Sequence, residues 1–362
     1  MSQTPVLNHK SRVPFLRRYA LIFSLLLVIV AIAFPYLVDR PRFWLPNVGI
    51  KTLWLGTIAM SLVFLNRYVG LLSLAQMTIA GISSYGVAYA TVQLGLPMFS
   101  AILIGLATGT LAGFLTALIA ARTKAIYFLM ITLALGQVFY SWAAQAIEVT
   151  NARRGLAPVP RPDWGLLDLS NLQTFYYFAL ALAIGCYLLC RFVVSTPFGL
   201  ALQGIRDSPE RMSALGYNVN RYRIAGITFA AFIASVGGIV LVLDRSQATP
   251  DIVDLPFTLD ILVVAVVGGI GSLGGAFIGG IVFVFLDNFA QDFTDRHMTL
   301  TGLVFIAVLY LAPAGLAGVG HQLRRVSDRM RTTKPRSSDK TLRQGTPTEP
   351  SADRALSKGK QQ

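Results

Sequence analysis

The chain has 362 residues, of which 54% are hydrophobic and only 13% are charged. A water-soluble protein of this length needs far more charge to cover its surface, so the composition excludes a soluble enzyme and indicates a polytopic membrane protein. The formal net charge is +14, and the segments 1–18 and 321–362 supply +11 of it. Basic tails beside membrane spans follow the positive-inside rule and attract anionic membrane lipid, so we do not expect a nucleic acid partner.

Apolar runs long enough to cross a bilayer as helices recur along the chain. They predict spans at 19–38, 48–65, 70–93, 98–121, 125–147, 174–194, 222–243, 257–286 and 299–317. The run at 257–286 is too long for one simple span, and its centre reads GGIGSLGGAFIGG. Irregular backbone at membrane depth is tolerated only where protein or a water-filled cavity covers it, so we predict two shorter helices with a hinge between them. The predicted hinge residues are Gly268, Gly269, Gly271, Gly274 and Gly275.

The predicted fold class is therefore all-α, a polytopic integral membrane helix bundle with a glycine-hinged broken helix. Basic residues gather at the N-terminus, at 122–124, at 195–223 and in the C-terminal tail, which assigns these parts to the cytoplasm. The segment 148–173 then faces outward. For the tail to end inside, the broken segment 257–286 must return to the outer side, which gives eight full crossings.

The two ends of the chain differ from the middle. The first apolar run contains Ala-Ile-Ala and could be a cleaved signal peptide, but its long basic flank and its continuation to Val38 favour an uncleaved span. The tail beyond Gly320 has almost no aliphatic content, so we expect it to be disordered. The predicted organisation is a basic cytoplasmic segment at 1–18, a transmembrane domain at 19–318 with a cytoplasmic loop at 195–221, and a basic tail at 319–362.

Glycine spacing carries two signals. Gly105, Gly109 and Gly113 fall four residues apart and line one helix face, where a neighbouring backbone can approach closely. The stretch GIGSLG matches the G-x-G-x-x-G dinucleotide fingerprint, but its flanks are membrane-length apolar runs without an alternating βαβ pattern. We interpret it as a membrane hinge.

Catalytic and nucleotide-binding patterns are missing from the sequence. It contains no G-x-x-x-x-G-K-[ST] loop, so if transport is driven by ATP the ATPase must be another polypeptide. The three histidines are scattered, and the two cysteines lie four residues apart inside an apolar run, where they are packing residues. We expect no metal site, no cofactor and no enzymatic activity.

The stretch ALQGIRDSPERMSALGYN interrupts the apolar chain with charges and predicts a short cytoplasmic helix. Ser208 can cap a helix whose first residue is Pro209, and a glycine suits the position just past its other end. Met212 and Leu215 are three residues apart and share its apolar face. Two turns bury too little for strong lipid binding, so a groove on a partner protein is a better dock than the lipid surface.

This part of the chain resembles a known family. STPFGLALQGIRDSPERMSALGYNVNRYRIAGITFAAFIASVGG is similar to the cytoplasmic coupling segment and following helix of LivM-type permeases of branched-chain amino acid ABC importers. Three stretches agree in the same order: LLSLAQMTIAGISSYGVAY (71–89), AIYFLMITLALGQVFY (125–140) and LDILVVAVVGGIGSLGGAFIGG (259–280). The resemblance, over 48–318, implies a permease in the bacterial cell (inner) membrane. It also implies a LivH-like second permease, two cytoplasmic ATPases and an extracytoplasmic substrate-binding protein.

The departures from this family fall where substrate would pass. The usual Gln-Leu-Ser-Leu-Gly becomes LLSLA, with Leu71 and Ala75 at its ends, and Gln137 occupies a position often taken by Glu. The Thr-Gly-Gly-x-x-Gly-Leu pattern of the outer loop becomes TNARRGL, with Asn151 and Ala152 in place of both glycines. Transport stays the interpretation, but the substrate stays open between branched-chain amino acids, urea, short amides and aromatic acids.

Polar side chains inside spans are expensive and are therefore candidates for the substrate path. The predicted path residues are Ser73, Gln76, Thr78, Ser83, Ser84 and Tyr85 in the third span and Tyr127, Thr132 and Gln137 in the fifth. The alternative interpretation is hydrogen bonding between helices.

The resemblance assigns the charged cytoplasmic stretch to ATPase coupling. We expect Met212 and Leu215 to enter a groove on an ATPase, while the charges around them set its register. The predicted coupling residues are Arg206, Asp207, Glu210, Arg211, Met212, Leu215 and Gly216.

Two other classes of function stay open at this point. An ion-coupled secondary transporter would require paired intramembrane carboxylates, whereas Asp260 stands near the start of a span with no basic residue close in sequence and better suits the interface. A membrane-embedded enzyme is the weakest candidate, because the spans hold no cluster of His, Asp, Glu or Cys at catalytic spacing.

Overall fold

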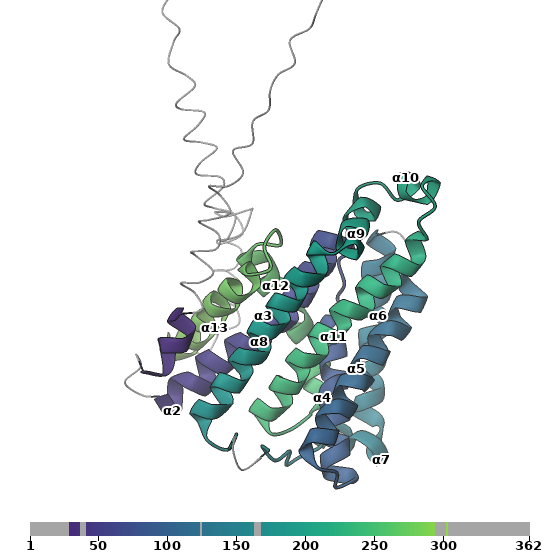
Figure 1. Ribbon diagram of the computed structural model, residues 1–362. Helices are drawn as coiled ribbons and strands as arrows, with labels where there is room; N and C mark the ends of the chain where they lie inside the picture. The colour runs from purple at the N-terminus through teal and green to yellow at the C-terminus, as the bar shows by residue number, and fades with distance from the viewer. Residues whose placement is uncertain (1–28, 37–40, 124, 163–167, 294–301, 303–362) are drawn as a thin grey trace, which may run out of the picture. The chain divides into compact units, whose positions relative to one another are not determined.

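The computed structural model describes residues 29–36, 41–123, 125–162, 168–293 and 302, and its regular elements in these ranges are helices (Figure 1). Residues 29–36 are helical and belong to the predicted first span. The predicted terminal segments 1–18 and 319–362, most of the first span and nearly all of the last span lie outside the described residues.

Five described helices are long and apolar enough to cross a membrane. The first, Arg42–Val69, joins α2 (Pro41–Trp44), the π-helical turn η1 (Leu45–Ile50), α3 (Lys51–Phe64) and the π-helical turn η2 (Leu65–Val69). The others are α5 (Met98–Ala120), α6 (Ala125–Gln145), α8 (Leu172–Ser195) and α11 (Val219–Arg245). They confirm the corresponding sequence predictions to within a few residues.

The third predicted span begins differently. Its first six residues, 70–75, are not helical, and the helix α4 (Gln76–Ala88) with its π-helical end η3 (Tyr89–Gln93) follows them. The chain reverses at Gly70, whose φ of 76° suits glycine, and then runs into the bundle with buried side chains. The Leu74 N–H donates to Thr132 Oγ1 at 3.1 Å, and the Ala75 N–H donates to Ser73 Oγ at 3.2 Å. Side-chain oxygens thus satisfy backbone groups that a helix would have paired.

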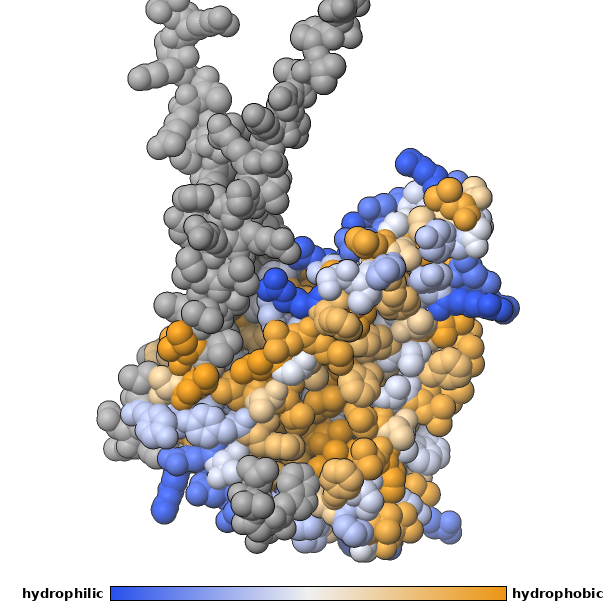
Figure 2. Space-filling view, in the orientation of Figure 1, coloured by the Kyte–Doolittle hydropathy of each residue, from blue (hydrophilic) through white to orange (hydrophobic). Residues whose placement is uncertain are grey.

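The helices α3, α4 and α11 form the centre of the bundle. More than four fifths of the apolar stretches of α3 and α11 is buried, whereas about three quarters of α5, α6 and α8 is not. A helix buried all round belongs to a core, and an apolar helix with an exposed face suits lipid or another membrane subunit. Figure 2 shows hydrophobic residues across the middle of one face and hydrophilic residues towards both ends.

Glycines set the contact between α5 and its neighbours, as the four-residue spacing predicts. Gly105, Gly109 and Gly113 are the buried glycines of α5. A Cβ at Gly105 would overlap the Ser83 carbonyl oxygen of α4, one at Gly109 would overlap Ser235 of α11, and one at Gly113 would overlap the Ala231 side chain. The absence of side chains at these positions lets α5 pack directly onto both central helices.

The long glycine-rich run is broken into α12 (Leu255–Gly268) and α13 (Gly275–Phe293), as predicted. A Cβ at Gly268 would meet the Gly275 carbonyl, and one at Gly279 would meet the Val264 carbonyl, so the two helices are antiparallel and almost touch. The segment therefore returns to the end of the bundle from which it started, as the charge pattern requires. Gly269 has a φ of 100° at the break. Flexing at this break stays a prediction.

Filling the α5 glycine face should destabilise the protein. Gly113→Leu places a branched side chain where Ala231 already lies, and overpacking of this kind costs about 1–3 kcal/mol or more. We expect a clear fall in melting temperature of the purified protein, measured by size-exclusion chromatography after heating. Gly185→Leu on the exposed face of α8 is the matched control, because a Cβ there meets nothing within 4 Å. Equal melting temperatures for the two variants would contradict this packing.

A candidate translocation path and coupling surface

The polar face of α4 towards α11 is fully bonded. Ser83 Oγ donates to the Ser235 carbonyl at 3.0 Å, and Ser84 Oγ donates to the Ala80 and Gly238 carbonyls at 2.9 and 2.7 Å. These bonds hold two central helices together at membrane depth. Hydrogen bonding between helices therefore explains why Ser83 and Ser84 are polar, and a role in the substrate path is not needed to explain them.

The face of α4 towards α6 is different, because its polar atoms are buried without partners. Thr78 Oγ1 faces Gly136 of α6, and the ring of Tyr85 stacks edge-on against Phe139 with centroids 6.2 Å apart. Gln76 lies on another face of α4, where its Oε1 accepts a hydrogen bond from Ser61 Oγ of α3 at 2.9 Å. Among the described residues, Gln76 Nε2, Thr78 Oγ1 and the Tyr85 hydroxyl have no hydrogen-bond partner. Such groups cost about 1–3 kcal/mol each when unpaired, which points to water or a passing solute as their partner.

The remaining path candidates fall into two groups. Thr132 Oγ1 donates to the Leu129 carbonyl at 2.9 Å and accepts from Leu74, and Ser73 accepts from Ala75, so both hold the irregular segment in place. Gln137 is half-buried. Tyr127 is 62% exposed near the cytoplasmic end of α6 and is not brought to the α4–α6 seam. We use the name α4–α6 seam for the surface formed by Thr78, Tyr85, Gly136 and Phe139.

The charged segment that is predicted to be cytoplasmic forms two short helices, α9 (Pro197–Asp207) and α10 (Pro209–Ala214). Arg206 donates to the Arg67 carbonyl at the end of the first long helix and packs against Gly70, while its guanidinium pairs with Asp207 at 2.6 Å. The role of Arg206 and Asp207 in setting the register of a partner stays a prediction. Within the chain, Arg206 ties α9 to the start of the irregular segment 70–75, a contact between residues 139 apart in sequence.

The helix α10 begins at Pro209, and Gly216 follows it with a φ of 89°, both as predicted. Two details differ. Ser208 makes no side-chain cap bond. Met212 is not on a free face with Leu215, because α10 folds back on α9 and places the Met212 sulfur 2.9 Å from where a Cβ of Gly204 would lie. The three-residue spacing of Met212 and Leu215 indicates that they share a face of α10. It does not indicate which part of that face a neighbouring helix covers.

What α10 leaves exposed is compact. Leu215 is 72% exposed, and Tyr217 is 41% exposed. Glu210 and Arg211 are also exposed beside them. We call these four residues the α10 surface.

The outer loop keeps the backbone that the family glycines would favour. Asn151 and Ala152 have φ of 59° and 51°, in the left-handed region, at the start of the 3₁₀ turn η4 (Ala152–Arg154). Thr150 Oγ1 donates to the Ala143 carbonyl at 2.7 Å and anchors the turn to the end of α6. Glycine adopts a left-handed backbone without a steric penalty. Ala152, which stands where the family pattern has glycine, adopts it at a steric cost.

The same loop is tied to the segment that covers α4. The Leu156 and Ala248 backbones exchange hydrogen bonds of 2.9 and 3.0 Å. Ala248 leads into the 3₁₀ turn η5 (Pro250–Val253), and Val253 packs against Gly81 of α4, 3.1 Å from where a Cβ would lie. The outer loop, η5 and α4 therefore form one connected structure at the outer end of the α4–α6 seam.

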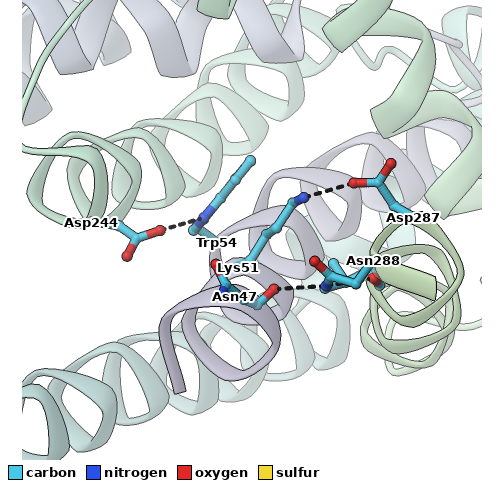
Figure 3. A network of polar contacts seen from close by, with 7 residues as sticks. Asn47, Lys51, Trp54, Asp244, Asp287 and Asn288 are labelled. Atoms are coloured by element: carbon cyan, nitrogen blue, oxygen red, sulfur yellow. Dashed lines mark hydrogen bonds and ion pairs between the residues drawn. The ribbon is translucent and has the colours of Figure 1, made fainter. Parts of the chain in front are cut away.

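A polar network at the same outer end escapes the sequence analysis (Figure 3). Lys51 Nζ pairs with Asp287 Oδ2 at 2.9 Å, and Trp54 Nε1 donates to Asp244 Oδ2 at 3.2 Å. These contacts join α3 to α13 and α11. Asp260 of α12 lies within electrostatic range of Lys51 and Asp287, so it does not stand alone. A charged residue in or beside an apolar run, such as Lys51 or Asp287, is the sequence feature that indicates such a contact. The sequence does not indicate that these two residues, 236 positions apart, pair with each other.

Membrane-length helices, a buried polar seam through the bundle and an exposed cytoplasmic helix pair define a polytopic membrane permease, a transport component. Residues 45–313 match the family model described as "Branched-chain amino acid transport system / permease component". The chain belongs to this family of ABC permeases. Its place is in the cell membrane, and family membership supports an ABC permease over an ion-coupled carrier or an enzyme.

Individual relatives carry different substrates. The chain is similar to the high-affinity branched-chain amino acid transport system permease protein LivM of Escherichia coli, with 23% identity over 321 residues, 82% of this chain and 74% of that protein. It is 26% identical over 187 residues to the probable branched-chain amino acid transport permease protein LivH of Methanocaldococcus jannaschii, covering 49% and 56% of the two chains. The ribose import permease protein RbsC of Haemophilus influenzae is 22% identical over 236 residues, covering 62% and 72%.

Removing a hydroxyl should separate path residues from structural ones. Thr78→Val deletes an unpaired buried oxygen, so we expect slower uptake in whole cells with an unchanged or higher melting temperature. Ser84→Ala deletes a bonded hydroxyl and should lower the melting temperature while leaving the substrate concentration for half-maximal uptake unchanged. Uptake at the unmodified rate by the Thr78 variant would remove it from the path.

Restoring a family glycine should stabilise the outer loop. Ala152→Gly relieves a left-handed backbone that costs about 1–2 kcal/mol for residues other than glycine, partly offset by the greater freedom of the unfolded chain. We expect a small rise in melting temperature. Ala107→Gly on an exposed position inside α5 is the opposite-sign control, because helical glycine costs about 1 kcal/mol relative to alanine. A fall for both variants would contradict the strained geometry.

Proposed function

We propose that this chain is the membrane-spanning permease subunit of an ATP-driven importer in the bacterial inner membrane, and that branched-chain amino acids are its substrate class. The LivM and LivH relatives support this substrate by their names, and the ribose relative shows that permeases of similar sequence carry other solutes. Selectivity must then come from the side chains along the path, rather than from the arrangement of helices.

The partners of the proposed complex each have a matching surface. A LivH-like second permease packs against the exposed apolar helices α5, α6 and α8, which a single subunit would leave to lipid. Two ATPases bind from the cytoplasm, since the sequence has no phosphate-binding loop. An extracytoplasmic substrate-binding protein delivers the solute from the other side.

Substrate passes along the α4–α6 seam in this proposal. The hydroxyls of Thr78 and Tyr85 are buried and lack partners among the described residues, so they can exchange hydrogen bonds with a polar solute. Phe139 beside Tyr85 offers an apolar surface for a branched side chain. Because these groups are uncharged, the solute is held weakly enough to leave.

The observation that carries the proposal is the α10 surface. An exposed leucine and tyrosine flanked by charges, on a short helix beyond the cytoplasmic ends of the long helices, is typical of a helix that docks in a groove of a partner. Leu215 is the anchor, and Glu210 and Arg211 lie beside it to fix orientation.

Motion of the ATPases reaches the path through packed contacts. Met212 of α10 rests on Gly204 of α9, and Arg206 of α9 holds the Arg67 carbonyl and contacts Gly70. Gly70 begins the irregular segment that leads directly to Gln76. A shift of α10 is therefore transmitted through α9 and the irregular segment to the first residue of α4.

Replacing the anchor should uncouple the transporter. Leu215→Asp places a charge in the proposed docking groove, so we expect loss of ATPase co-purification and loss of uptake, with unchanged membrane abundance and melting temperature. Leu94→Asp is the matched control, because Leu94 is 55% exposed near the opposite end of the protein.

The two variants separate docking from general damage. Retained ATPase binding and uptake in the Leu215 variant would show that the α10 surface is only a solvated loop and would overturn the proposal. Loss of binding in both variants would show that a surface charge on either side prevents assembly, which would also contradict a specific anchor.

A further inference from the structure

Positive charge on the outer side of a membrane protein runs against the positive-inside rule and calls for a local reason. For three outer cations the reason is internal. Lys51 pairs with Asp287, and Arg161 donates to the Leu243 and Asp244 carbonyls at 3.1 and 3.4 Å. The Arg245 guanidinium lies 5.0 Å from the centre of the Phe257 ring.

Arg153 and Arg154 have no such reason. Both are exposed on η4, and neither forms an ion pair or side-chain hydrogen bond within the part of the chain that the structure describes. The turn beneath them is fixed, because Thr150 anchors its start and the Leu156–Ala248 bridge holds its end. Two adjacent arginines are thus presented on a backbone that is already ordered, which lowers the entropy lost on binding.

The turn that carries Arg153 and Arg154 is connected to α4, so a partner bound to these arginines can act on α4. The Leu156–Ala248 bridge connects this turn to η5, and Val253 of η5 lies on Gly81 of α4. A partner held by the arginines therefore sits over the element that covers the outer end of the α4–α6 seam.

We propose that Arg153 and Arg154 form the docking contact for an acidic surface of the extracytoplasmic substrate-binding protein, and that docking there acts on α4 through η5. This inference rests on the proposed function, because it requires a binding protein as partner. It assigns that partner a site on this subunit and a complementary charge. Pairing of exposed charges contributes to association rate and orientation more than to affinity.

The test is binding of the purified substrate-binding protein of the same gene cluster to the full transporter in nanodiscs of neutral lipid, followed by biolayer interferometry. For the double variant Arg153→Glu and Arg154→Glu we expect an association rate lower by about tenfold at low salt, with the difference shrinking as salt is raised. The double variant Arg153→Lys and Arg154→Lys keeps both charges and should associate nearly as fast as the unmodified protein. Arg42→Glu, at an exposed arginine of α2, is the control for a charge reversal elsewhere on the protein surface.

Each outcome decides a different point. An unchanged association rate in the glutamate variant, or an equal fall in the Arg42 control, would overturn the docking assignment while leaving the proposed function standing. Slow association that appears only in nanodiscs containing anionic lipid would identify the arginines as a lipid contact and would also overturn it. If the unmodified transporter does not bind the substrate-binding protein at all, the proposed function itself fails.

Discussion

The constraint on which the structure depends is that no water is available inside the hydrocarbon to satisfy polar groups. The irregular segment 70–75 exists at membrane depth because Ser73 and Thr132 accept its backbone N–H groups. Ser83 and Ser84 are tolerated because they bond to carbonyls of α11. Where the same rule is left unmet among the described residues, at Thr78 and Tyr85, the unpaired hydroxyls can bind water or a solute. The unpaired hydroxyls therefore say more about function than the hydrogen-bonded ones do.

Close packing through glycine makes this arrangement stiff. A side chain at Gly109 or Gly113 would overlap residues of α11, and one at Gly238 of α11 would overlap the Ala80 carbonyl of α4. Helices in such close contact cannot slide past one another without opening voids between them. Each void removes van der Waals contacts, and lipid cannot enter the packed interface to restore them. α6, by contrast, has far fewer contacts with the central helices, and only about one fifth of its apolar stretch is buried. The α4–α6 seam lies at the boundary between the stiff and the loose parts.

Hydropathy could predict the spans because burial in lipid depends on local composition, and it could predict the break at 269–274 because glycine disfavours continuous helix. It could not predict that 70–75 is extended, since a buried apolar run reads the same in either conformation. Met212 was misplaced because sequence spacing does not reveal the return of α10 onto α9. The Lys51–Asp287 pair depends on tertiary folding alone, as does the division of the α4 hydroxyls into bonded and unbonded faces.

These observations give α4 a particular position. Its inner end continues from the segment that Arg206 contacts through Gly70, and its middle, at Gly81, packs against Val253 of η5. The cytoplasmic helices and the outer loop, which are far apart in space, therefore act on the same helix from opposite ends. In the proposed complex, a change at either end would bias the unpaired groups of α4, and such a shared bias is what couples two sites. The left-handed Ala152 fits this picture, because a strained but fixed turn keeps the outer contact in register with η5.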